Sequence, residues 1–334
     1  MKALNFFSIL FFFTFFSWSQ QSKINGISFV ASRDTINQKH INPVVNINAN
    51  YAAIMPFAFL RSTKDSIIKY NSNRQWFGES RRGVKQYVQS LKKNNIKIML
   101  KPQVWIWRGE YTGFIKMNTE AGWKELEKTY SKFILDFASL ANDLQVELFC
   151  LGTELEQFVA QRPQFWFTLI KKIKTIYKGK LTYAANWDEF KRIPFWKELD
   201  YIGVDAYFPV SENKTPSIAD CKLGWAKHKP VIKDLSKAHN RPILFTEFGY
   251  RSVDFTAKEP WRSDRELNVV NLQAQVNATK ALFEEFWKED WFAGGFIWKW
   301  YHNYESSGGK DNNRFTPQNK PTEALIRRQF GAGI

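Results

Sequence analysis

The sequence predicts an α/β protein folded as a single (β/α)8 barrel, also called a TIM barrel, and three observations lead to this prediction. Eight short apolar runs recur along residues 23–334, and helix-like patterns lie between most of them. Alternating strands and helices are typical of a parallel sheet with crossover helices, and eight strands are the number that closes a barrel. The alternative, an open doubly wound sheet, requires a glycine-rich phosphate turn after its first strand. Residues 28–33 contain no glycine, so the barrel is favoured.

The predicted strands are the apolar runs at residues 24–30, 51–60, 97–102, 146–152, 181–185, 201–206, 242–247 and 293–298. The helical patterns between them include residues 82–93, 122–142, 163–177, 216–239 and 267–288. No repeat, low-complexity tract or linker interrupts residues 23–334. We therefore predict that this segment forms one domain.

Residues 1–19 are predicted to be a signal peptide that is not part of the barrel. Lys2 supplies a positive start, an apolar run follows at residues 6–16, and Ser17 and Ser19 form a small-x-small cleavage pattern. The apolar run is too short to span a bilayer comfortably, which makes an uncleaved anchor the less favoured alternative. We expect an exported protein, periplasmic or secreted, with no stable membrane insertion after the segment is removed.

The composition is that of a globular protein with an unusual aromatic content. Hydrophobic residues make up 44% of the chain and charged residues 24%, which excludes a disordered chain. Aromatic residues make up 17%, with 14 Trp, more than core packing requires. Such a surplus favours a surface for flat, partly apolar ligands such as sugar rings, bases or peptides. The net charge of +16 comes from lysines spread along the chain without a basic block, so no nucleic-acid partner is expected.

Several other chemistries lack their sequence signals. The chain has four His and only two Cys, without a Cys pair at ligand spacing, so no metal site is expected. Cys150 lies in an apolar run and is interpreted as a packed thiol, while a disulfide with Cys221 remains an alternative. The sequence has no Gly-x-Ser-x-Gly elbow, no Walker loop and no His-Glu-x-x-His helix.

Two carboxylates are the candidate catalytic pair, because the active site of a barrel lies at the carboxyl ends of its strands. Glu154 follows the fourth predicted strand and Glu247 ends the seventh, so they are expected on opposite walls of the barrel mouth. One carboxyl group can protonate a leaving oxygen while the other attacks or activates water, as in glycoside hydrolysis. A separation of about 5–5.5 Å would predict retention of anomeric configuration, and roughly 6.5–9.5 Å inversion. No cofactor is expected, since two carboxylates suffice.

Two neighbouring acidic residues are alternatives to this pair. Glu156 competes with Glu154, because residues two apart on a strand share a face. Glu154 is preferred, since the strand is expected to end there and Glu156 is expected in the following loop. Asp205, at the end of the sixth predicted strand, is interpreted as a hydrogen-bond acceptor behind the pair and less readily as a catalyst.

Aromatic and polar side chains near other strand ends are candidate substrate contacts. Trp298 ends the last predicted strand and can form the floor on which a sugar ring stacks, and Trp105 and Trp107 are similar platforms beyond the third. Packing in the core is the alternative for these Trp residues. Tyr207 can hydrogen-bond a carboxylate and hold it ionised, and Asn186 can line the cleft.

Four segments occur at barrel spacing in a characteristic order: residues 151–154 (LGTE), 201–207 (YIGVDAY), 245–250 (FTEFGY) and 296–300 (FIWKW). Together they resemble glycoside hydrolase family 113, a branch of the retaining clan A of (β/α)8 glycosidases, and the resemblance covers nearly all of residues 23–330. It implies a catalytic domain acting by double displacement, with Glu154 as acid/base and Glu247 as nucleophile. It also implies that Trp298 stacks under the sugar at the cleavage point and that Tyr207 positions Glu247.

The resemblance implies an endo-β-1,4-mannanase with a β-1,4-linked mannan or manno-oligosaccharide as substrate. Much of the clan carries Asn immediately before the acid/base, where it contacts the sugar 2-hydroxyl that distinguishes mannose from glucose. This sequence has Thr153 at that position. A β-glycosidase acting on another hexose polymer or oligosaccharide is therefore an alternative, and so is a catalytically silent carbohydrate-binding barrel.

Overall fold

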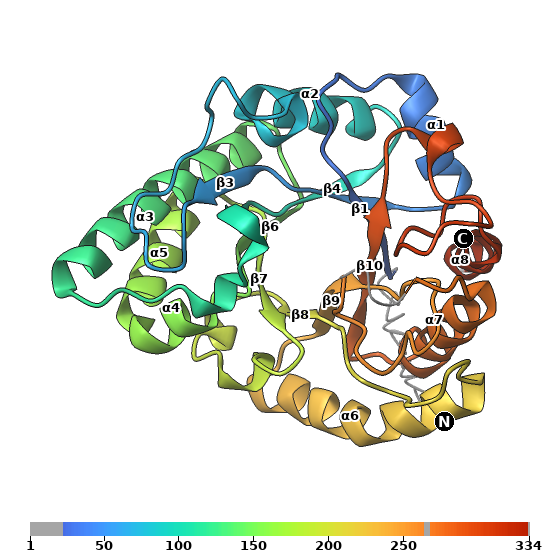
Figure 1. Cartoon of the computed structure of the whole chain (residues 1–334). Helices are drawn as coiled ribbons and strands as arrows, with labels where there is room; N and C mark the ends of the chain where they lie inside the picture. Colours follow the sequence, from blue (N-terminus) through green and yellow to red (C-terminus); the bar gives the residue numbers. More distant parts are fainter. Residues whose placement is uncertain (1–22, 264–267, 333–334) are drawn as a thin grey trace, which may run out of the picture.

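Eight parallel strands close into a barrel in the computed structural model, which describes residues 23–263 and 268–332 (Figure 1). The order around the barrel is β1 (Ile24–Phe29), β10 (Phe292–Trp300), β9 (Ile243–Phe248), β8 (Ile202–Asp205), β7 (Lys180–Asn186), β6 (Leu148–Thr153), β4 (Lys97–Leu100) and β2 (Tyr51–Ile54). The first and last barrel strands, β1 and β10, pair in parallel and complete the ring. The predicted (β/α)8 barrel is confirmed.

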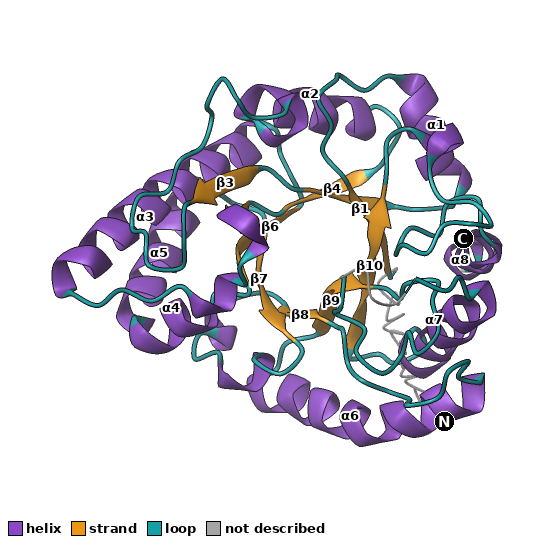
Figure 2. Ribbon diagram, viewed as in Figure 1, coloured by secondary structure: helices purple, strands orange, loops and turns teal. Residues whose placement is uncertain are grey.

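Helices surround the ring of strands (Figure 2). They are α1 (Gln38–Asn46), α2 (Arg81–Lys92), α3 (Glu120–Asp143), α4 (Glu156–Gln161), α5 (Pro163–Ile176), α6 (Ile218–His239), α7 (Leu272–Phe286) and α8 (Pro321–Gly331). Three of them begin after a hydroxyl residue whose side chain accepts a first-turn backbone N–H: Ser80 before α2, Thr119 before α3 and Ser217 before α6. The helix starts are therefore encoded locally.

One predicted strand is wrong: residues 51–60 do not form a single strand. β2 ends at Ile54, and the chain resumes as β3 (Phe57–Leu60), which pairs with β5 (Gln103–Ile106) in a separate two-stranded sheet. Proline has no backbone N–H for a strand ladder, and Pro56 stands at the break. Pro102 similarly separates β4 from β5. β3 consequently lies outside the ring, on the side of α3 (Figure 2).

A small apolar cluster fills the barrel interior, apart from the larger core that the helices cover. Its members come from alternate positions of the strands: Ile24, Ala53, Met99, Leu148, Cys150, Ala184, Leu244 and Phe296. Gly26 gives the Phe296 ring its space, because a Cβ atom there would lie 2.3 Å from the ring. The interior is thus packed, and a ligand can enter only above it.

Two further predictions concern the cysteines and the N-terminal segment. Cys150 and Cys221 are both free and buried, so the alternative of a disulfide is not realised. Among the helices of residues 23–263 and 268–332, none combines the length and apolar character needed to cross a bilayer. The predicted signal peptide at residues 1–19 lies outside the described residues.

Candidate active site

A cavity of about 820 Å³ opens at the carboxyl ends of the barrel strands. It is lined by six of the predicted site residues: Trp105, Glu154, Asn186, Tyr207, Glu247 and Trp298. An adjoining cavity shares Glu154, Glu247 and Trp298 with the first and is also lined by Thr153 and Asp205. The two cavities form one cleft, called the catalytic cleft below. Of the nine predicted site residues only Trp107 lines neither cavity.

Strand register explains why several of these polar side chains meet. Asp205 on β8 pairs with Glu247 on β9, and Asn186 on β7 pairs with Asp205. In a parallel ladder, paired residues lie at the same height in the barrel wall. The three side chains therefore form a row at the carboxyl end of the barrel, where ligands of this fold bind.

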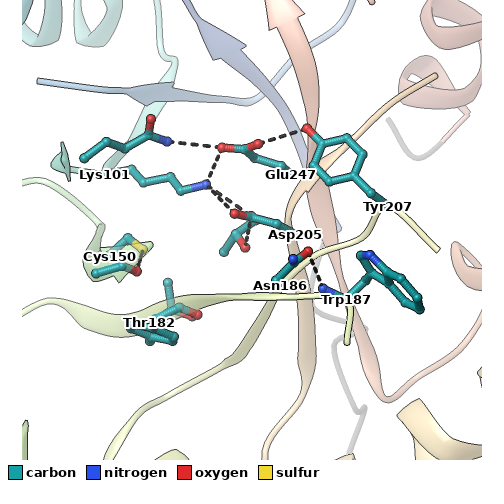
Figure 3. Close-up of polar contacts among 12 residues, drawn as sticks. Lys101, Cys150, Thr182, Asn186, Trp187, Asp205, Tyr207 and Glu247 are labelled. Atoms are coloured by element: carbon teal, nitrogen blue, oxygen red, sulfur yellow. Dashed lines mark hydrogen bonds and ion pairs between the residues drawn. The ribbon is translucent and has the colours of Figure 1, made fainter. Parts of the chain in front are cut away.

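Glu247 is held by three hydrogen-bond donors, of which Lys101 and Tyr207 are labelled in Figure 3. Lys101 Nζ lies 2.5 Å from Glu247 Oε1, and Gln103 Nε2 donates to the same oxygen at 3.1 Å. The Tyr207 hydroxyl donates to Glu247 Oε2 at 2.9 Å. The carboxyl group is buried, with 6% of the residue exposed. Donors to both oxygens stabilise its negative charge and fix its orientation.

Lys101 also joins Glu247 to Asp205. Its ammonium lies 3.1 Å and 3.3 Å from the two carboxylate oxygens of Asp205, and the Thr246 hydroxyl donates to Asp205 Oδ1 at 2.7 Å. Burial raises the pKa of Asp205 to about 7, and the neighbouring Glu247 charge adds to the increase while Lys101 opposes it. Burial alone would lower the pKa of Lys101, but the two carboxylates outweigh it and raise that pKa. The single positive charge of Lys101 thus forms ion pairs with two buried acidic groups.

Glu154 has a different environment. It follows β6 with φ of 51°, in the left-handed region that is strained for a residue other than glycine, and its backbone N–H donates to Ala184 O at 2.8 Å. Its carboxyl group forms no hydrogen bond with any described residue, in contrast to Glu247. Burial raises the pKa of Glu154 well above its usual range, and the charges of Asp205 and Glu247 raise it further. Two carboxyl groups with such unequal environments suit an acid paired with a nucleophile or base.

Glu156, the alternative to Glu154, is the first residue of the short helix α4 and does not lie in a loop as expected. Its carboxylate pairs with the exposed Arg192 at 2.5 Å. It lines neither cavity of the catalytic cleft. Glu156 is therefore a partner in a surface ion pair, and Glu154 remains the candidate catalytic residue.

The predicted aromatic platforms separate into two groups. Trp298 on β10 and Trp105 on β5 both line the catalytic cleft. The end of β9 approaches Trp298 so closely that a Cβ atom at Gly249 would lie 2.5 Å from the Trp298 carbonyl oxygen. Trp107 is 69% exposed and lines, together with Trp105, a shallow cavity beside β3. The structure thus extends an aromatic surface outward from the cleft but does not bring Trp107 into it.

Residues that were not predicted also build the site. Besides Lys101 and Gln103, Tyr111 lines the cleft and its hydroxyl accepts a hydrogen bond from Asn186 Nδ2 at 3.0 Å. Glu189, only 1% exposed, accepts the Asn186 backbone N–H at 3.2 Å. Lys101 could have been predicted from the sequence, because it is a charged residue at the carboxyl end of a predicted apolar strand.

A sequence model of glycoside hydrolase family 113 matches residues 30–320, most of the chain. The chain belongs to glycoside hydrolase family 113. This confirms the resemblance noted in the sequence. No protein of curated function matches this family 113 chain in sequence.

Solved structures similar to this family 113 chain share its fold. A GH113 β-mannanase from Alicyclobacillus acidocaldarius, in complex with ManMIm, matches with a TM-score of 0.82 and 23% identity over 94% of this chain and 98% of that one. A GH113 β-1,4-mannanase matches with 0.81 and 20% identity over 93% and 100%. A β-glucuronidase from Ruminococcus gnavus matches with 0.63 and 14% identity over 92% of this chain and 50% of its own.

Residues 23–263 and 268–332 contain no group of three or more His, Cys, Asp or Glu placed to hold a metal ion. The acidic cluster of the cleft instead holds the Lys101 ammonium.

Proposed function

We propose that this glycoside hydrolase is a retaining β-mannanase that cleaves β-1,4-linked mannan or manno-oligosaccharides by double displacement. The unequal environments of two carboxyl groups in one cleft support this mechanism most directly. The Glu247 carboxylate accepts three hydrogen bonds, whereas the Glu154 carboxyl group accepts none from the described residues and has a pKa well above its usual range. Family membership and the similarity to GH113 β-mannanases support mannan as the substrate.

In the first step Glu154 is the acid and Glu247 the nucleophile. Glu154 donates its proton to the glycosidic oxygen as the bond from that oxygen to the anomeric carbon breaks. Glu247 attacks the anomeric carbon and forms a glycosyl ester with the enzyme. Tyr207 and Lys101 orient the attacking carboxylate, each from a different oxygen.

In the second step Glu154 changes role, and electrostatics supports that change. The charge of Glu247 is one cause of the raised pKa of Glu154. When Glu247 becomes an ester, this charge disappears and the pKa of Glu154 falls. Glu154 can then stay ionised and take a proton from the water that hydrolyses the ester.

Thr153 bears on which hexose the enzyme prefers. Its hydroxyl is buried beside Glu154, lines the cleft, and forms no hydrogen bond within the described residues. The protein therefore leaves the hydrogen-bonding capacity of this hydroxyl unused. Because Thr replaces an Asn that contacts the 2-hydroxyl in much of the clan, a β-glycosidase acting on another hexose is the second candidate function.

Product analysis of the purified protein tests the substrate and the stereochemistry. We expect manno-oligosaccharides from β-1,4-mannan and none of the corresponding products from cellulose, xylan or chitosan. Proton NMR of the first products should show the β anomer. Release from cellulose but not from mannan would favour the second candidate, and a first-formed α anomer would contradict retention.

Three carboxamide variants test the residue roles. Glu154→Gln should lower kcat by about 10²–10⁴-fold, since a general acid is removed. Glu247→Gln should abolish turnover while the protein still binds manno-oligosaccharides in calorimetry. Glu156→Gln is the matched control, because it removes a carboxylate two residues from Glu154 but outside the cleft. Turnover by Glu247→Gln at the wild-type rate would exclude Glu247 as the nucleophile.

A further inference from the structure

We propose that the catalytic cleft recognises a sugar that carries a carboxylate, and that Lys299 and Arg314 bind this carboxylate. The inference rests on the proposed function, because it deepens the substrate class of the same site. The ligand would be a β-linked hexose chain in which a hexuronate lies at or next to the cleavage point. A neutral mannan backbone offers no negative charge to these two residues.

Lys299 places a positive charge beside the expected sugar platform. It follows Trp298 on β10, is half-buried, and lines both cavities of the cleft. Its ammonium lies 5.1 Å from the Trp298 ring centroid and 5.4 Å from that of Tyr301. The rings orient the ammonium by cation–π attraction but carry no net charge. The charge therefore stays available to a ligand on the platform.

Arg314 lines the same cavity from the loop before α8. Its backbone is held on both sides: its N–H donates to Asn312 Oδ1 at 2.9 Å, and its carbonyl oxygen accepts from the buried Lys320 Nζ at 2.7 Å. The half-buried side chain is thus carried by a fixed segment of backbone. A guanidinium group can bind a carboxylate through two parallel hydrogen bonds.

Among the described residues, neither cation has an acidic partner. No ion pair joins Lys299 or Arg314 to an acidic residue of the described ranges, 23–263 and 268–332. Lys101 in the same cleft is instead engaged by two carboxylates. Glu247 is held by Lys101, and burial raises the pKa of Glu154, which favours its protonated form. Asp188 lines the same cavity but forms no ion pair with Lys299 or Arg314.

A carboxylate fits these observations better than a hydroxyl group. Two cations without an acidic partner among the described residues attract a negatively charged ligand into a concave site. Charge-assisted hydrogen bonds are also roughly twice as strong as neutral ones. The alternative is that Lys299 and Arg314 contact hydroxyl groups of a neutral chain, and the experiment separates the two.

Calorimetric titration needs no turnover and uses two matched ligands, mannohexaose and mannohexaose oxidised at C6 to carry carboxylates. The wild-type protein should bind the oxidised ligand about tenfold more tightly, as expected for a hydrogen bond between charged groups. Lys299→Met and Arg314→Met should each remove most of this preference, and Arg314→Lys should retain part of it. Lys128→Met is the control: it removes one positive charge from α3, where Lys128 is 76% exposed and pairs with Glu125.

The outcomes distinguish this inference from the proposed function. Equal affinities of the wild-type protein for the two ligands would overturn it, and so would variants that weaken both ligands by the same factor. Hydrolysis of unmodified mannan with no preference for the oxidised ligand would leave the mannanase proposal standing alone. A charge-dependent preference in a protein that hydrolyses neither ligand would support the carboxylate site and contradict the mannanase proposal. Circular dichroism of each variant confirms that it is folded.

Discussion

Lys101 is the residue that allows two carboxylates to be buried side by side. Its ammonium contacts both Asp205 and Glu247, and the residue has no exposed surface. A buried ion pair contributes little net stability, but loss of one partner leaves a charge buried without compensation. Asp205 and Glu247 would then repel each other across adjacent strands. Lys101 is therefore expected to affect stability and nucleophile geometry together.

The variant Lys101→Met should lower the free energy of unfolding at pH 7 by about 3–5 kcal/mol, the usual effect of breaking a buried pair. Adding Asp205→Asn should recover part of this loss, because one of the two uncompensated charges is removed. Urea unfolding of both variants measures the effect. If Lys101→Met is as stable as the wild-type protein, the ammonium does not balance the two acids.

Glu189 should make stability depend on pH. Burial raises its pKa from 4.5 to about 8, so between these values the native state keeps a proton that the unfolded state has released. Stability from this group is therefore present at low pH and is lost as pH rises toward 8. Glu189→Gln, which is neutral at every pH, should gain stability relative to the wild-type protein by up to about 1.4 kcal/mol per pH unit in this window. Urea unfolding of both proteins at three pH values would measure this gain. Curves of stability against pH that run parallel for the two proteins would contradict the prediction.

At the scale of the elements, local pattern predicts the barrel strands better than the interruptions between them. Each barrel strand is an apolar run, because both of its faces are buried, and such runs are visible in the sequence. The pairing of β3 with β5 instead depends on contact between segments that are distant in the chain. In the sequence, only Pro56 and Pro102 indicate the breaks between β2 and β3 and between β4 and β5. The sequence pattern therefore encodes the ring but not the small sheet beside it.

The same distinction applies to the site. Glu154, Tyr207 and Glu247 could be predicted because they follow or end barrel strands, where the fold concentrates its chemistry. Tyr111 lies in the connection between β5 and α3, and Glu189 lies after β7. Irregular segments have no periodicity that indicates the direction of a side chain. Their contribution becomes visible only when the barrel brings them together with Asn186.

The small sheet gives the cleft an aromatic wall that can be tested residue by residue. Trp105 lines the catalytic cleft, whereas Trp107 lies beyond it and is more exposed. Trp105→Ala should raise KM for mannohexaose several-fold, because about 1 kcal/mol of ring stacking is lost. Trp107→Ala should have a smaller effect on the same ligand. Equal changes in KM for the two variants would show that the substrate runs along the outer surface as well.

For the whole molecule, the joint between the two ends of the chain is the feature that makes the barrel one unit. β1 pairs with β10, and α8 covers this joint from outside. The Asn25 side chain donates to the Phe330 carbonyl oxygen at 3.3 Å and accepts the Trp287 indole N–H at 2.9 Å. These contacts lie near the start of β1, at the end of the barrel opposite the cleft. At this end of the barrel, stability is thus supported by residues that take no part in catalysis.

Phe330→Ala should separate the two properties. The Phe330 ring is 1% exposed and packs against Phe283 and Trp287, with centroid distances of 6.0 and 6.4 Å. Its truncation should lower the free energy of unfolding by about 3–5 kcal/mol and leave kcat/KM close to the wild-type value at moderate temperature. Urea unfolding followed by Trp fluorescence and by far-UV circular dichroism should give coincident transitions. In a closed barrel each half is paired with strands of the other half, so the two halves should unfold together. Transitions that differ between the two probes would mean that the α7–α8 end unfolds as a separate unit, and that closure by β1 and β10 does not bind the barrel into one cooperative structure.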